Sequence, residues 1–124
     1  MKETSFYQRL LKKAENVKIG SLVKFILNDN IELRVAEKTG NLIFMDKRYE
    51  AGWIREGSKP TEARSVVAYI LDKRSYSPDF YEFEIETPKG KKGLVRLNHC
   101  KGLRYRLNLK RILDSLMQTA KYQL

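Results

Sequence analysis

The sequence contains a single cysteine, Cys100, and a single histidine, His99. One cysteine excludes an internal disulfide, and a zinc site would need carboxylates for most of its ligands, so we expect no structural metal and no cofactor. Neighbouring residues on a strand point to opposite faces, which predicts a buried Cys100 beside an ordinary surface His99 rather than a thiol activated by imidazole. The glycine-rich loop of nucleotide hydrolases and the nucleophile elbow of serine hydrolases are also missing from the sequence.

Long apolar runs are missing as well. No stretch approaches the ~18 apolar residues of a membrane span, and the opening residues, Met1 to Glu3, lead into no apolar run of signal-peptide length. A cytoplasmic location is therefore the expectation. The 124 residues are 42% hydrophobic, which is enough for one ordinary core, so residues 1–124 are expected to form a single domain.

Three segments have apolar residues at helical spacing, which predicts three helices. The first covers about residues 4–17, where Thr or Ser supplies an N-cap. The second follows Pro60, a residue well tolerated in a first helical turn, and ends near Lys73. The third is amphipathic and begins at about Asn108.

Strands are indicated where apolar and polar residues alternate, or where a short apolar run is bounded by turn residues. The expected strands are 22–27, 31–35, 42–45, 81–86 and 94–97. We expect the first three to form a meander and the last two to form a hairpin. Residues 47–59 indicate no single element. The pattern predicts an α+β fold, with a mainly antiparallel sheet of about five strands packed by two to three helices.

Acidic residues are nearly absent from the last third of the chain. Residues 1–86 carry 15 Lys or Arg against 14 Asp or Glu, whereas residues 87–124 carry 10 Lys or Arg against Asp114 alone. The net charge of +10 therefore comes almost wholly from this basic C-terminal third. Like charges at such density repel one another, and a bound polyanion turns that repulsion into affinity. The sequence thus predicts a nucleic-acid-binding protein.

Two basic features are expected to contact the phosphate backbone. A lysine-tipped hairpin turn at residues 89–93 has a shape that fits a DNA groove or straddles phosphates. Cations at the start of the last helix would join its free N–H groups in binding a phosphate. Tyr105 and Trp53 are candidates for stacking on unpaired bases. The expected binding residues are Lys89, Lys91, Lys92, Arg96, Lys101, Arg104, Tyr105, Arg106, Lys110 and Arg111.

Residues 57–68 resemble the second-helix signature of double-stranded-RNA-binding domains. The likeness rests on Gly57, Ser58 and Lys59, followed by Glu62, Ala63 and Arg64, and then by Val67 and Ala68. The resemblance implies a helix here, with Lys59 and Arg64 as binding residues. It concerns only the middle of the chain, and Pro60 stands where the family has a lysine.

Two other functions fit the sequence. The same basic surface would suit an acidic protein partner, as in a regulator or inhibitor of nucleic-acid machinery. The acidic residues within 79–86 loosely match the carboxylates of metal-dependent nucleases, but the Glu-x-Lys triplet of those enzymes does not occur there. Catalysis is therefore the weakest alternative, and no catalytic or metal-binding residue is assigned. DNA and RNA are about equally favoured as targets.

Overall fold

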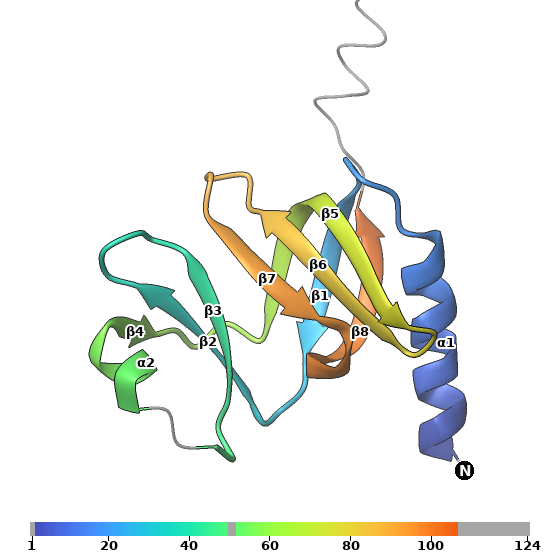
Figure 1. Ribbon diagram of the computed structural model, residues 1–124, viewed down its shortest axis with the longest axis horizontal. Helices are drawn as coiled ribbons and strands as arrows, with labels where there is room; N and C mark the ends of the chain where they lie inside the picture. The colour runs from blue at the N-terminus through green and yellow to red at the C-terminus, as the bar shows by residue number, and fades with distance from the viewer. Residues whose placement is uncertain (1, 50–51, 107–124) are drawn as a thin grey trace, which may run out of the picture.

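The computed structural model describes residues 2–49 and 52–106, most of which form one strongly curled sheet (Figure 1). The sheet is mixed and has eight strands in the order β4-β2-β3-β7-β6-β5-β1-β8. Within the described residues, one helix alone has seven or more residues, so the expected sheet of about five strands with two to three packing helices is wrong. The elements are α1 (Lys2–Asn16), β1 (Leu22–Leu27), β2 (Ile31–Ala36), β3 (Leu42–Asp46), α2 (Gly52–Glu56), β4 (Ser58–Pro60), β5 (Ser65–Ser77), β6 (Phe80–Glu86), β7 (Lys92–Arg96), the 3₁₀ turn η1 (Leu97–His99) and β8 (Cys100–Arg106).

Helix α1 confirms the helix expected near the start of the chain. Leu10, Ala14 and the following Val17 recur at helical spacing and are buried in the core. The ammonium of Lys73 in β5 donates to the carbonyls of Glu15 and Val17, at 2.6 and 3.2 Å. A cation at this end stabilises the helix, because the last carbonyls have no intrahelical partner. Neither described α-helix is long and apolar enough to cross a membrane.

The second expected helix, from Pro60 to about Lys73, is wrong, because most of that stretch belongs to β5. Val66, Ala68 and Ile70 are buried at alternate positions, as a strand requires. The run is apolar almost throughout, so it fits a helical period as well as a strand period, and periodicity alone does not separate the two. Its β-branched residues favour the extended form.

The resemblance to double-stranded-RNA-binding domains is contradicted by the same segment. In place of that family's second helix, the chain forms β4, a short loop and the start of β5. Lys59 lies in the edge strand β4. Arg64 donates hydrogen bonds to the backbone carbonyls of Ile31 and Asn28, at 2.9 and 2.6 Å. Its guanidinium thus ties the loop to β2 and does not mark a helix N-terminus.

The expected strand ranges are close to those observed, but their pairing differs in part. Hairpins form between β2 and β3 and between β6 and β7, as expected. β1 pairs with β5 and β8 instead of β2, so the expected meander of the first three strands is wrong. The stretch at 47–59, where the sequence indicates no element, contains α2 and most of β4.

The core lies inside the curl of the sheet, with α1 along one side (Figure 1). β1 shows the strand alternation most clearly, because each of its inward residues is fully buried and each residue between them is half-buried. The rings of Phe25 and Phe83 meet at the centre with their centroids 5.5 Å apart. The largest fully buried side chains are Phe25, Phe83, Leu27, Ile31, Ile70, Ile85, Leu97, Leu103, Val23 and Val95.

A single parallel pair, Leu42 with Gly93, joins β3 to β7. On one side of this junction lie β2, β3, β4 and α2, which we call the lobe. On the other side lie the antiparallel strands β7, β6, β5, β1 and β8, which we call the barrel. A Cβ atom at position 93 would lie 2.9 Å from the Cβ of Leu42 and 3.0 Å from its carbonyl oxygen. Glycine is therefore what permits the close approach of the two strands.

A buried arginine holds the lobe together. Arg34 of β2 is 7% exposed, and its guanidinium donates to the hydroxyl and the carbonyl of Ser58, at 2.7 and 2.9 Å. It also donates to the carbonyl of Arg55 at 3.4 Å and pairs with Glu32 at 2.5 Å. A buried cation is tolerated when its donors are satisfied in this way. These contacts fix α2 and β4 against β2.

Gly93→Val is expected to lower the free energy of unfolding by about 1–3 kcal/mol, because the added side chain forces β7 away from Leu42. Urea denaturation followed by circular dichroism measures this loss. Gly52→Ala is the control, since a Cβ there meets nothing within 4 Å and stability should not fall. Equal stability of the two variants would contradict the role given to the junction.

Candidate nucleic-acid interface

The basic residues singled out in the sequence fall on two separate parts of the barrel. Lys89, Lys91, Lys92 and Arg96 belong to the hairpin of β6 and β7, whereas Lys101, Arg104, Tyr105 and Arg106 belong to β8. In the sheet, β6, β5 and β1 lie between β7 and β8. Lys110 and Arg111 lie outside the described residues, together with the last expected helix and the phosphate site at its start.

Two of these cations are already paired with carboxylates. Arg96 Nε lies 3.4 Å from a carboxylate oxygen of Glu82, and Lys101 Nζ lies 2.9 Å from one of Asp29. The hydrogen bond from Lys101 lowers the pKa of the Asp29 carboxyl below its ordinary value. The basic third of the sequence contains no acid near these positions, but folding brings acids to it from residues 1–86. Arg96 and Lys101 are therefore weaker candidates for phosphate contact.

Where β8, β1 and residues 65–69 of β5 pair, the outward face carries no acidic residue, and the first acid along β5 is Asp72. Lys24 of β1 lies opposite Arg104 of β8 on one side and Val67 of β5 on the other. The neighbours of Lys24 along β1 point inward and are buried, so Lys24 and its cross-strand partners point outward. We call this surface the basic sheet face, and its residues are Leu22, Lys24, Ile26, Ser65, Val67, Tyr69, Gly102 and Arg104.

Lys24 and Arg104 are directly opposed in the β1–β8 ladder. Opposed residues in an antiparallel pair have Cβ atoms about 5 Å apart, and like charges at that separation destabilise the sheet. Within the described residues, no ion pair involves either side chain. An anion bound between them would remove the repulsion. Sequence reasoning missed Lys24, although it is the lone cation in the apolar run 22–27.

The hairpin tip is exposed, as expected. The N–H of Thr87 donates to the carbonyl of Lys91 at 2.7 Å, and Gly90 has a φ of 88°, which glycine adopts without strain. Lys89, Lys91 and Lys92 are exposed, and none of them forms an ion pair with any residue that the structure describes. The turn and the end of β8 lie at the same end of the barrel (Figure 1).

The two expected stacking residues do not form one surface. Trp53 is 79% exposed and belongs to α2 in the lobe, whereas Tyr105 is 53% exposed and belongs to β8 at the far edge of the barrel. Sequence reasoning missed a third aromatic residue, Tyr69 of β5. Tyr69 lies in the basic sheet face opposite Leu22, and its other neighbour, Glu86 of β6, marks where the acid-free surface ends.

The glutamates of β6 face arginines on the two neighbouring strands, β5 and β7. Glu82 lies opposite both Arg74 and Arg96, with its oxygens 3.8 and 3.4 Å from their nitrogens. Glu84 lies 3.5 Å from Arg74. These carboxylates are therefore engaged by guanidinium groups. Across the described part of the chain, no three or more His, Cys, Asp or Glu residues are grouped so that they could hold a metal ion.

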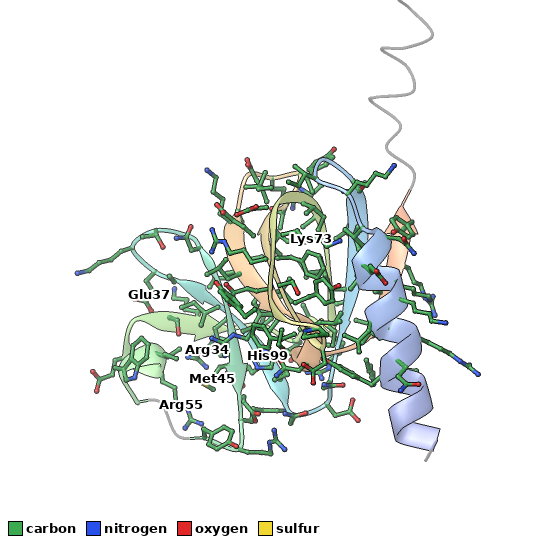
Figure 2. The ribbon with its side chains drawn as sticks, turned by 45° about the vertical axis from the view of Figure 1, so that its right-hand side comes forward. Arg34, Glu37, Met45, Arg55, Lys73 and His99 are labelled. Carbon is green, nitrogen blue, oxygen red and sulfur yellow. The ribbon has the colours of Figure 1, made fainter. Side chains whose placement is uncertain are left out.

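Cys100 is buried, as expected, and burial raises the pKa of its thiol to about 12, which leaves it protonated and unreactive at neutral pH. His99 is not the ordinary surface residue expected. Its side chain is half-buried, and its Nδ1 has no hydrogen-bond partner among the described residues. Burial, and then the charge of Arg96, lowers its pKa. Figure 2 shows His99 between the barrel and the lobe residues Arg34 and Met45.

A groove of about 1130 Å³ lies where the lobe meets the barrel. The lobe supplies an apolar wall that includes Phe44 and the exposed Trp53. The outer surface of β6 and β7 supplies the other wall, which carries carboxylates as well as cations. The groove therefore differs in charge from the basic sheet face, and a site for phosphate is favoured on the sheet face alone.

The pH dependence of stability is expected to reflect His99. Its pKa is lowered on folding, so as the pH falls below 6.5 the unfolded chain takes up a proton that the folded chain resists, and stability falls. The His99→Gln variant should lose this dependence. Lys101 and Arg48 lower the pKa values of Asp29 and Asp46. Protonation of these two carboxylates therefore affects stability only below about pH 4. Urea denaturation of the wild type and of His99→Gln at pH 7.5 and at pH 5 tests this prediction. An equal loss of unfolding free energy in the two proteins on going to pH 5 would contradict it.

Comparisons of the chain with protein-family models, with curated proteins and with solved structures gave no match. The function is therefore inferred from the charge, register and exposure of the residues described above.

Proposed function

We propose that the protein binds nucleic acid through the basic sheet face and the neighbouring hairpin tip, in the cytoplasm. The observation that carries this proposal is the direct opposition of Lys24 and Arg104 on a face without acidic residues. Such a pair costs folding free energy unless an anion lies between its members. Lys89, Lys91 and Lys92 extend the cationic surface at the hairpin tip.

The spread of the cations favours a polymer over a small anion. Adjacent strands lie about 4.8 Å apart, so the four steps from β8 to β7 cover roughly 19 Å along the sheet. A single phosphate group reaches one end of that surface only. A nucleic-acid backbone presents phosphates at intervals along its length and contacts both ends at once. Because phosphate contacts carry no sequence information, affinity is expected to be general rather than specific for one site.

The aromatic and apolar residues of the basic sheet face favour a single strand over a duplex. Tyr69 lies there beside Leu22 and Val67, so a flat ring and apolar side chains adjoin the two opposed cations. Unpaired bases stack on aromatic rings while their phosphates lie along basic residues. In a duplex the bases are already stacked, and they gain nothing from such a platform.

The Lys24→Gln/Arg104→Gln variant is expected to bind labelled single-stranded RNA or DNA about tenfold or more weakly than the wild type. Fluorescence anisotropy over a range of salt concentrations measures this. The slope of log affinity against log salt should fall in magnitude by about two, one for each lost phosphate contact. Stability should not fall, because the substitutions remove a repulsion.

The Lys12→Gln/Lys38→Gln variant is the matched control, because it removes the same charge from exposed positions outside the basic sheet face. It should retain nearly all of the wild-type affinity. Equal losses in the two variants would assign the binding to net charge alone. Absence of binding at low salt in every format would exclude the nucleic-acid function and favour an acidic protein as the partner of this face.

A further inference from the structure

The lobe and the barrel leave two strand edges open where they separate. β3 pairs with β2 along its whole length on one side, and β7 pairs in the same way with β6. On their other sides the two strands meet at one pair, Leu42 with Gly93, and no further β3–β7 pair occurs in the described residues. Residues 43–46 of β3 and 94–96 of β7 thus border a gap, which we call the seam.

Hydrogen-bond alternation shows which backbone groups of β3 point into the seam. Ala36 donates to Asn41, and Lys47 donates to Asn30, at 2.9 and 2.8 Å. These bonds lie at the two ends of the β2–β3 ladder, and hydrogen-bonded pairs alternate along it. Odd-numbered residues of β3 therefore bond to β2, and the N–H and C=O of Phe44 point to the seam.

The same reasoning applies to β7. The N–H of Thr87 donates to the carbonyl of Lys91 at 2.7 Å, so the next hydrogen-bonded pairs along the β6–β7 ladder involve Gly93 and Val95. The C=O of Leu94 and the N–H of Arg96 then point openly to the seam from the other side, because the parallel pair with Leu42 uses the N–H of Leu94 and the carbonyl of Arg96 accepts from the Cys100 thiol at 3.6 Å. Two open edges facing one gap form a site at which an added strand can pair.

The groove described above lies over this seam. It is lined by Phe44 of β3, by Leu94 and Arg96 of β7 and by His99, whose Nδ1 has no hydrogen-bond partner among the described residues. Leu94 is 49% exposed, and Trp53 stands across from it on the lobe. Exposed apolar side chains at the rim of a groove, together with open strand edges, are typical of a site that binds an extended peptide.

We propose that the seam binds an extended segment of an acidic partner protein, which pairs as a strand with the open edges of β3 and β7. Side chains of such a strand alternate between the two faces of the sheet. Those on the core side adjoin Phe44, which is partly buried and lines the groove, and are apolar. Those on the outer side adjoin Lys92, which forms no ion pair with a described residue, and are acidic.

Charge separates this occupant from the other candidates. Two copies of a chain with a net charge of +10 repel each other, which disfavours self-association at the seam. A phosphate backbone is disfavoured because it has no N–H to donate to the open carbonyls of the seam and cannot complete a strand ladder. An acidic protein segment is attracted by the whole molecule and meets Lys92 at the rim. This site shares Lys92 with the hairpin tip but lies apart from the basic sheet face, which is formed by β8, β1 and β5.

Selection of a random-sequence peptide library on the full-length protein tests the proposal. Peptides that bind the wild type are expected to alternate apolar and acidic residues and to lack proline, which cannot complete a strand ladder. Binding of each selected peptide is then measured by fluorescence of Trp53, the sole tryptophan and a residue of the groove wall. A change in its emission should accompany binding.

Leu94→Glu and Ile19→Glu form a matched pair, because both replace an exposed apolar residue by an acid and only the first lies in the groove. The selected peptides should bind Leu94→Glu about tenfold or more weakly and Ile19→Glu as tightly as the wild type. Proline at the centre of a peptide should abolish binding. The proposal is overturned if no peptide is enriched, if enriched peptides lack the alternation, or if the two variants bind them equally.

Discussion

The contact between Leu42 and Gly93 is the constraint on which the rest of the architecture depends. It is the single pair between β3 and β7 in the described chain, and it exists because position 93 has no side chain to hold the strands apart. On one side of it the barrel curls around the core, to which Ile31, Leu33 and Leu42 of the lobe also contribute. On the other side the lobe is held by Arg34 and turns away from the barrel. The groove between them is a consequence of how short this contact is.

Strand order then decides where charge gathers. Within the described residues, the cations of the C-terminal third are divided between the hairpin of β6 and β7 and the strand β8, and β7 and β8 lie at opposite edges of the barrel. On β7, Lys92 and Arg96 lie opposite acids of β6 in a nearly neutral ladder. On β8, Lys101 pairs with Asp29, but Arg104 lies opposite Lys24 of β1, which supplies no acid. The basic sheet face is therefore cationic, whereas on β6 and β7 the positive and negative charges nearly cancel. Net charge alone does not distinguish these two surfaces, but strand register does.

Local patterns in the sequence predicted what is local in the structure. The first helix, the hairpin of β6 and β7 and the burial of Cys100 follow from short-range periodicity and turn residues. The pairing of β1 with β5 and β8 joins segments far apart in the chain, and no spacing within the apolar run 22–27 encodes those partners. The strand β5 was mistaken for a helix because Val66, Ala68 and Ile70 fit either period.

The candidate site was predicted only in part, for the same reason. Arg104 and the hairpin lysines lie on exposed surfaces, but the acids that neutralise Arg96 and Lys101 come from earlier segments of the chain. Lys24 became a candidate only when the register placed it opposite Arg104. A sequence records which charges are near one another along the chain. Tertiary pairing decides which of them remain unopposed.

The most direct test of where nucleic acid binds is an NMR titration of the isotope-labelled protein with a single-stranded oligonucleotide at low salt, followed through backbone amide shifts. The amides of Lys24, Val67, Tyr69 and Arg104 should shift together, because they belong to one acid-free face of the sheet. The amide of Phe44, in the groove, should not move. Shifts confined to the groove, with none on β1 or β8, would contradict the proposal that the basic sheet face binds phosphate and the seam binds a peptide.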